Sequence, residues 1–119
     1  TGLIMVLALN YGARQEIVDG VRKFTASVVS GKEGLEGLNT ETFSRYLYTS
    51  GLPDPDLLIR TSGEMRLSNF MLWQLSYAEF YFSKKYWPDF HRKDLEEAIE
   101  DYKKRKRRFG GLDVGEKDN

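Results

Sequence analysis

The period of the hydrophobic positions changes from one segment to the next, which predicts strands alternating with helices. Residues 3–9 form a continuous apolar run, typical of a strand buried on both faces of a parallel sheet. From residue 13 to about residue 30, apolar side chains recur every three or four positions, which predicts an amphipathic helix. We expect its buried face to contain Ile17, Val18, Val21, Phe24 and Val28. A strand, a short turn and a helix in this order open a βαβ unit.

The rest of the chain predicts further short elements. Prolines exclude a helix over residues 51–56, and residues 57–59 follow as a short buried strand. Before this segment, we expect a helix capped by Asn39 or Thr40 and running to about residue 48. After the strand, we expect a short helix over 70–77, a strand over 80–82 and a turn over 87–90. A long charged helix should then run from 92 to about 108, ended by Gly110 and Gly111. The pattern predicts an α/β protein with a mostly parallel sheet flanked by helices. The strands are too few for a complete sheet, so we expect an incomplete part of a larger fold.

Composition narrows the class of protein. The chain has 119 residues, of which 40% are hydrophobic, as in a globular domain rather than a disordered segment. The 18 basic and 18 acidic residues balance, so no global field attracts a polyanion. Cysteine is absent and His91 is the single histidine, which excludes disulfides and leaves too few ligands for a zinc site. No apolar run approaches the roughly 20 residues that span a bilayer, and we expect a cytoplasmic protein.

The loop after the predicted strand 57–59 is the first candidate for chemistry. In open α/β sheets, ligands bind beyond the carboxyl ends of the strands, where this loop lies. Arg60 and Arg66 offer guanidinium forks that suit phosphate oxygens, Ser68 adds a hydroxyl, and the start of the next predicted helix adds backbone N–H groups. Together they predict a diphosphate cradle. The alternative is a solvated loop whose arginines pair with Glu64 or Asp56.

Glu79 is the second candidate, because its neighbours in the sequence are almost all apolar. A carboxylate in such surroundings needs a partner, since an unpaired buried charge costs several kcal/mol. That partner could be Arg60, Arg66 or a magnesium ion, which favours a carboxylate combined with substrate phosphate. A structural ion pair and a metal site are both open at this point.

The run of basic residues over 103–108 is the third candidate. It could bind nucleic acid, anionic lipid headgroups or a substrate phosphate, or it could be a solvated helix end, where cations also suit the helix dipole. We favour the solvated end for most of the run. Arg108 is the exception, because the turn that follows it could aim its side chain.

Read together, these segments resemble the cis-prenyltransferases, also called isoprenyl or undecaprenyl diphosphate synthases. Residues 10–14 are similar to the family's N-Y-G-G-R element, and residues 56–69 to its D-L-x-I-R-T-G-G-E-x-R-x-S-N element. Residues 73–82, 87–90 and 107–111 are similar to W-Q-x-x-Y-A-E-x-Y-F, W-P-x-F and R-R-F-G-G. The matches are collinear over nearly the whole chain.

The resemblance implies a reaction. Isopentenyl diphosphate condenses in cis with an allylic diphosphate such as farnesyl diphosphate, and repetition yields a long polyprenyl diphosphate carrier lipid. It implies that Arg60, Arg66 and Ser68 bind the diphosphate of isopentenyl diphosphate, with Leu67 contributing backbone. It also implies that Glu79 helps to hold magnesium.

The resemblance further implies a homodimer in which Arg108 and Gly110 reach the active site of the partner subunit. The product lipid would lie at the inner membrane face, and no nucleic acid would be bound. We expect residues 1–111 to form the C-terminal half of the family domain and residues 112–119 a polar, mobile tail. The family's catalytic aspartate, in its N-terminal D-G-N-G-R-W segment, is not in this chain, so we expect the 119 residues alone to be inactive.

Two positions depart from the family pattern. Ala13 and Ser62 both replace glycines, and alanine at residue 13 requires an ordinary φ there. Competing hypotheses are a non-catalytic phosphate- or nucleic-acid-binding α/β module and a catalytically silent partner subunit. The second is disfavoured because the diphosphate arginines are present.

Overall fold

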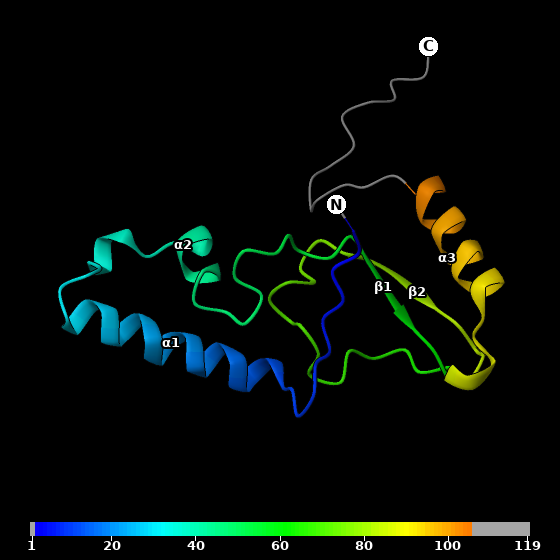
Figure 1. Ribbon diagram of the computed structural model, residues 1–119, viewed down its shortest axis with the longest axis horizontal. Coiled ribbons are helices and arrows are strands. Elements are labelled where there is room, and N and C mark those ends of the chain that lie inside the picture. Colours follow the sequence, from blue (N-terminus) through cyan, green and yellow to red (C-terminus); the bar gives the residue numbers. More distant parts are fainter. Residues whose placement is uncertain (1, 106–119) are drawn as a thin grey trace, which may run out of the picture. The chain divides into compact units, whose positions relative to one another are not determined.

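The computed structural model describes residues 2–105, which fall into two compact units. The first unit contains the described part of Thr1–Pro53 together with Leu67–Trp73. The second contains Asp54–Arg66 and the described part of Gln74–Asn119. Figure 1 shows the helices α1 and α2 of the first unit, and the strands β1 and β2 with helix α3 of the second.

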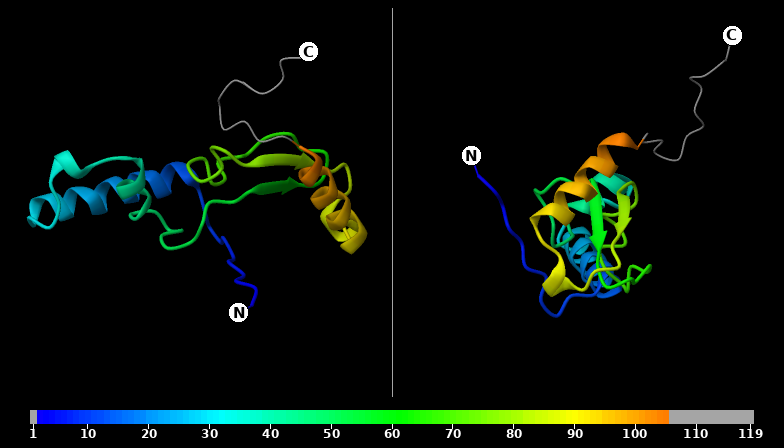
Figure 2. Two further views of the ribbon diagram at one scale, coloured as in Figure 1. Left: turned by 90° about the horizontal axis from the view of Figure 1, so that it is seen from above. Right: turned by 90° about the vertical axis from the view of Figure 1, so that its right-hand side faces the viewer.

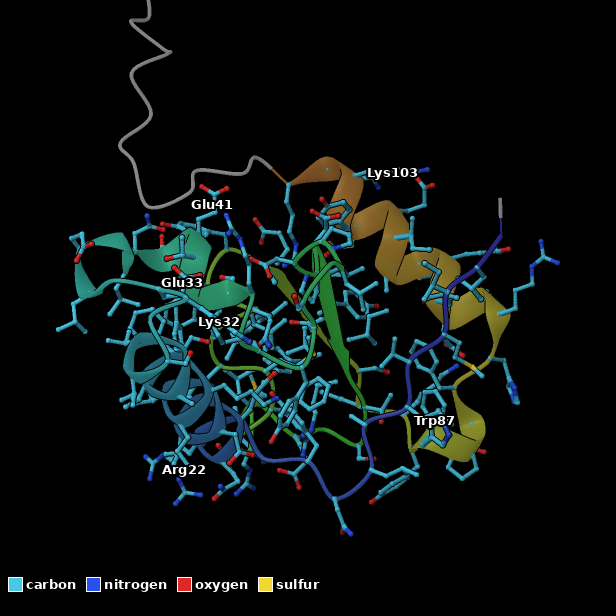
Figure 3. The ribbon with its side chains drawn as sticks, turned by 60° about the vertical axis from the view of Figure 1, so that its left-hand side comes forward. Arg22, Lys32, Glu33, Glu41, Trp87 and Lys103 are labelled. Atoms are coloured by element: carbon cyan, nitrogen blue, oxygen red, sulfur yellow. The ribbon has the colours of Figure 1, made fainter. Side chains whose placement is uncertain are left out.

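Helix α1, Ala13–Val29, confirms the predicted helix, but its buried face differs from the expected one. The buried residues are Ala13, Glu16, Gly20 and Phe24, whereas Val18 and Val21 are 45% and 50% exposed. Arg22 points into solvent from the same helix (Figure 3). Phe24 is buried as expected, whereas Val18 and Val21 are not, because hydrophobicity alone did not show which side of the helix meets its neighbours.

Gly20 sets the packing of α1 against the next segment. A Cβ at this position would meet the Phe43 ring at 3.1 Å and Leu47 at 3.3 Å, so a larger residue would require these side chains to shift by a few tenths of an ångström. Phe43 lies in α2, Thr40–Ser44, and its ring meets Trp73 edge-on with centroids 5.1 Å apart. These buried contacts form the core of the first unit.

Asn39 caps α2, as predicted. Its side chain accepts a hydrogen bond from the Thr42 amide, and the Thr42 hydroxyl accepts one from the Asn39 amide, both at 2.9 Å. The helix ends at Ser44 rather than near residue 48, and turns follow it. A short 3₁₀ helix, Leu35–Gly37, precedes it.

The apolar run 3–9 is extended but is not a strand, which corrects the prediction for it. Figure 2 shows it as an open trace that leads into α1. A strand requires a hydrogen-bonded neighbour, and within the described residues none pairs with this segment. Six of its apolar side chains are 64–94% exposed: Leu3, Ile4, Met5, Val6, Leu7 and Leu9.

The second unit is built on a parallel pair of strands, which confirms the predicted parallel sheet. Strand β1, Leu57–Arg60, pairs with β2, Glu79–Phe82, in the register Leu57 to Glu79 and Arg60 to Phe82. A 3₁₀ helix, Trp87–Asp89, and helix α3, Arg92–Lys104, follow. None of the helices among residues 2–105 has the length and apolar character needed to cross a membrane.

Residues 70–77 form turns instead of the predicted short helix. Ser68, Asn69 and Met71 have φ values of 52°, 60° and 47°, in the left-handed region. That conformation cannot continue into a right-handed helix, so the expected helix start is absent here. Helix α3 ends at Lys104 rather than near residue 108, because Arg105 is already extended with φ −81° and ψ 140°. Gly110 and Gly111 lie outside the described residues.

We predict that Ser62→Gly stabilises the chain. Ser62 has a φ of 67°, which costs a non-glycine residue about 1–2 kcal/mol, while glycine costs about 0.5–1 kcal/mol of chain entropy. Urea unfolding should therefore show a gain of roughly 0.5 kcal/mol. Thr61→Gly, in the same loop at an ordinary φ, should instead lose stability, and equal effects of the two changes would contradict the strain argument.

We also predict that Asp94 stabilises the folded chain at neutral pH and that this stabilisation is lost in acid. Asp94 caps α3 by accepting from the His91 amide at 2.8 Å, and it pairs with Lys85 at 2.6 Å. The Lys85 ammonium and the His91 amide lower the pKa of Asp94. Because this pKa is lower in the folded chain, the stabilisation is present above the unfolded value of about 3.9 and is lost as the pH falls through the folded value.

The measurement is the Tm of the wild type and of Asp94→Asn from about pH 7 to about pH 2. The wild type should have the higher Tm at neutral pH, and the two should converge in acid. Glu96→Gln, in an exposed pair with Arg92, is the matched control and should follow the wild type. A gap that does not narrow in acid would refute the role of Asp94.

Candidate functional site

Arg60 ends β1, and the loop that follows it is tied to the chain after β2. The Ser62 amide donates to the Lys85 carbonyl at 2.7 Å, and the Gly63 amide donates to the Ser83 carbonyl at 2.9 Å. These two N–H groups are therefore used within the fold. At these two positions the backbone is not available to an anion, whereas the arginine side chains of the loop can supply positive charge.

Arg66 is held by Glu64 on the surface of this loop. Its Nε and Nη2 atoms lie 2.8 and 2.7 Å from the same carboxylate oxygen, Oε2. The Arg66 and Glu64 side chains are 70% and 40% exposed, and an exposed pair contributes only about 0–1 kcal/mol. A diphosphate, whose charge-assisted bonds to arginine are worth about 1.5–3 kcal/mol each, can replace Glu64 as the partner.

Arg60 is half-buried and has no ion-pair partner among the described residues. The alternative of a loop whose arginines are neutralised by acids thus holds for Arg66 and not for Arg60. A guanidinium at the carboxyl end of a strand, without an acid beside it within residues 2–105, is suited to an anionic ligand.

Glu79 lies at the opposite end of the strand pair from Arg60. It is paired with Leu57 at the start of β1, three residues or about 10 Å from the end at Arg60. Side chains alternate between the two faces of a sheet, so Glu79 and Arg60 also project from opposite faces. The structure therefore does not bring these two residues into one local pocket.

The partner of Glu79 is Arg105, not Arg60 or Arg66 as the sequence had suggested. Arg105 follows α3, and its Nη1 lies 2.5 Å from the Phe80 carbonyl oxygen and 3.4 Å from Glu79 Oε2. Its Nη2 is much closer to Asp101, at 2.5 Å. The bond to Glu79 is the longest of the three, so a metal ion can replace it while Arg105 keeps its other bonds.

The donor set around Glu79 is limited to one carboxylate. Among the described residues there is no group of three or more His, Cys, Asp or Glu side chains that could hold a metal. Magnesium commonly binds through one or two carboxylates and the phosphates of the substrate, and it keeps several waters. Glu79 fits that mode of binding, in which the substrate supplies part of the coordination shell.

Leu67 and Ser68 belong to the first unit and are positioned by Asn69. The Asn69 carbonyl accepts from the Ala13 amide at 2.8 Å, and its side-chain Oδ1 accepts from the Arg14 amide at 3.0 Å. Ser68 and Asn69 are both left-handed, which costs about 1–2 kcal/mol at Ser68, so the segment depends on these bonds to keep its conformation.

Gly12 allows Asn69 to lie close to the start of α1. A Cβ at position 12 would meet Asn69 Nδ2 at 2.9 Å. Ala13 is in the helix with an ordinary φ, as its replacement of a glycine required.

Sequence reasoning missed Glu16. The residue is 1% exposed and accepts hydrogen bonds from the Tyr11 hydroxyl and, at 2.8 Å, from the Tyr48 amide. Its spacing of four residues to Gly20 and eight to Phe24, both buried, was the available signal. An acidic residue on the buried face of a helix indicates a carboxylate that is held by hydrogen-bond donors inside the protein.

The basic run at the end of α3 is partly used within the second unit. Lys103 pairs with Glu100 at 3.2 Å and lies near the end of the helix (Figure 3). Arg105 bonds to Asp101 and to β2. Lys104 is exposed at the last position of α3. Residues 106–108, and with them Arg108, lie outside the described residues, as does Gly110.

The sequence is similar to known proteins over most of its length. Residues 1–110 match a family model described as putative undecaprenyl diphosphate synthase. An isoprenyl transferase of Clostridium perfringens is 54% identical over 112 residues, which are 94% of this chain and 44% of that protein. One of Thermotoga maritima is 57% identical over 110 residues, 92% of this chain and 46% of that protein. The chain thus spans about half the length of the curated relatives it matches.

Solved structures agree with the sequence matches. The structure of lavandulyl diphosphate synthase from Lavandula x intermedia, in complex with dimethylallyl diphosphate, superposes with a TM-score of 0.82 at 46% identity, covering 86% of this chain and 44% of that one. A probable undecaprenyl diphosphate synthase from Campylobacter jejuni gives a TM-score of 0.68 at 37% identity, with 86% and 45% covered. With the motifs at residues 10–14 and 56–69, these matches show that the chain belongs to the undecaprenyl diphosphate synthase family of isoprenyl transferases.

Proposed function

We propose that this chain supplies the isopentenyl diphosphate site of a cis-prenyltransferase. The observation that carries the proposal is Arg60, a half-buried arginine at the carboxyl end of β1 that forms no ion pair within residues 2–105. Arg66, Ser68 and the backbone of Leu67 complete the site for the diphosphate. The allylic substrate would be a farnesyl-type diphosphate.

The reaction needs stabilised negative charge rather than a nucleophilic side chain. The allylic carbon–oxygen bond breaks, and its electron pair leaves with the diphosphate. The double bond of isopentenyl diphosphate forms the new carbon–carbon bond, and a proton is lost to give the cis product. Arginines that fix the diphosphate of the acceptor hold its double bond in line with the allylic carbon, which lowers the entropic part of the barrier.

Magnesium is the proposed cofactor, held by Glu79 together with substrate phosphate. When bound, it would neutralise charge on the departing diphosphate. Arg105 keeps the Glu79 carboxylate oriented by a 3.4 Å contact that a metal can displace.

The partner is proposed to be a second copy of the complete protein. In that homodimer Arg108 and Gly110 would contribute to the other subunit's site, and the long lipid product would be released at the cytoplasmic membrane face. The alternative of a nucleic-acid-binding module has less support, because Lys103 and Arg105 are already paired with acidic residues of the same helix.

The test of the diphosphate site uses a chimera. The 112 matched residues of the Clostridium perfringens relative are replaced by those of this chain, and condensation of labelled isopentenyl diphosphate is measured. Arg60→Ala and Arg66→Ala should each lower kcat/KM by about 10- to 100-fold, because each removes charge-assisted bonds worth about 1.5–3 kcal/mol. Arg92→Ala, which removes an exposed guanidinium on α3, should behave as the unmodified chimera.

An unchanged kcat/KM in both arginine variants would remove them from the site. The isolated 119-residue chain serves as the background sample. It should give no product, since it covers only 44% of the length of that active relative's sequence.

The metal proposal has its own variant. Glu79→Gln in the chimera should raise the magnesium concentration needed for half-maximal rate by about tenfold, since an anionic ligand becomes neutral. Glu100→Gln, an exposed acid on α3, is the control. If Glu79→Gln leaves the magnesium dependence as in the control, Glu79 does not hold the metal.

A further inference from the structure

Glu16 is a buried carboxylate that none of the proposed catalytic roles uses. It lies in the first turn of α1 with 1% of its surface exposed. Burial of a charge requires donors to replace the lost water. The Tyr11 hydroxyl donates to Oε1, and the Tyr48 amide donates to Oε2 at 2.8 Å. The carboxylate therefore joins three segments: the turn before α1, α1 itself and the loop after α2.

Tyr11 is fixed by both its hydroxyl and its ring. Burial, followed by the Glu16 carboxylate, raises the pKa of the Tyr11 phenol, which keeps it a hydrogen-bond donor. Its ring meets Tyr48 and Phe70 edge-on, at centroid distances of 6.2 and 5.6 Å. Tyr11 thus links Glu16, through its hydroxyl, to Phe70, through its ring, and Phe70 lies two residues after Ser68.

A second connection reaches the same segment through the backbone. The amides of Ala13 and Arg14, in the turn of helix that carries Glu16, hold Asn69 through its carbonyl and its side chain. Ser68, Asn69 and Met71 are left-handed residues without glycine's freedom, and such conformations persist only when their surroundings fix them. The segment 67–71 therefore depends on how the start of α1 is held.

We propose that Glu16 is a positioning residue for Leu67 and Ser68, which bind the substrate diphosphate. Its carboxylate fixes Tyr11 and the start of α1, and these in turn fix Asn69 and Phe70 on either side of the left-handed segment. The inference rests on the proposed function, because it takes Ser68 as a ligand of isopentenyl diphosphate. Glu16 itself touches no substrate in this arrangement.

The experiment uses the 119-residue chain and has two readouts. Isopentenyl diphosphate is titrated to give its Kd, and hydrogen exchange is followed at the Phe70 amide, which donates to the Leu67 carbonyl at 3.2 Å. In Glu16→Ala the Phe70 amide should exchange about tenfold faster, because the segment is held less firmly. The Kd should rise by about tenfold, since displacing a positioned group by about 1 Å can lower a reaction rate by as much as about 100-fold. Tyr11→Phe should shift both readouts in the same direction.

Rescue separates positioning from general destabilisation. Glu16→Gln can accept from the Tyr48 amide and donate to the Tyr11 oxygen, so both readouts should remain close to those of the wild type. Phe24→Leu disturbs the other end of α1, where Phe24 meets Tyr46, and it should lower Tm without changing either readout. If Phe24→Leu, at an equal loss of Tm, shifts both readouts as Glu16→Ala does, the role of Glu16 is only structural and the inference is overturned.

The two readouts also separate this inference from the proposed function. If Arg66→Ala weakens binding while Glu16→Ala changes neither Kd nor exchange, the positioning role is wrong and the diphosphate site stands. If no variant affects the Kd but Glu16→Ala still speeds exchange at Phe70 and Glu16→Gln does not, Glu16 positions the segment and the diphosphate assignment fails.

Discussion

The hydrogen bonds between the start of α1 and Asn69 are the constraint on which the first unit depends. The first amides of a helix have no partner within it, and here two of them are satisfied by a residue more than fifty positions away. Asn69 supplies both acceptors, one from its backbone and one from its side chain. Gly12 leaves room beside it, because a Cβ there would meet Asn69 Nδ2 at 2.9 Å and the Asn69 side chain would have to shift. The motif at residues 10–14 therefore both starts α1 and holds the segment 67–71 in place through Asn69.

The second unit depends on the register of its two strands. Parallel pairing of Leu57 with Glu79 brings the loop after Arg60 beside the chain after Phe82, and it leaves Glu79 at the far end. The loop is then held by the bonds of Ser62 and Gly63 to the chain after β2. The residues proposed to bind the diphosphate and the metal, Arg60 and Glu79, thus lie at different ends of one small sheet. A diphosphate bound near Arg60 and a metal bound near Glu79 would have to be brought together by residues outside this strand pair.

Much of this could be predicted from the sequence, for identifiable reasons. The parallel strands follow from short apolar runs flanked by polar residues, and α1, the Asn39 cap and α3 follow from periodicity and side-chain chemistry. The strand predicted over 3–9 was wrong because strand formation needs a neighbour, which a pattern within one segment does not supply. The prediction of a helix over 70–77 was wrong because serine and methionine rarely adopt the left-handed backbone found at Ser68 and Met71. Only Asn69 is of a residue type that adopts it readily.

The most instructive omission is Glu16, which an apolar-stripe analysis treats as a solvent-facing residue. Its burial depends on donors in two other segments, the turn before α1 and the loop after α2, which only the folded chain brings together. The most direct test of the central constraint is hydrogen exchange at the Ala13 and Arg14 amides of the unmodified chain. Both should be strongly protected, although they lie in the first turn of a helix. Exchange as fast as that of exposed loop amides would show that Asn69 does not hold the start of α1, and would contradict the account.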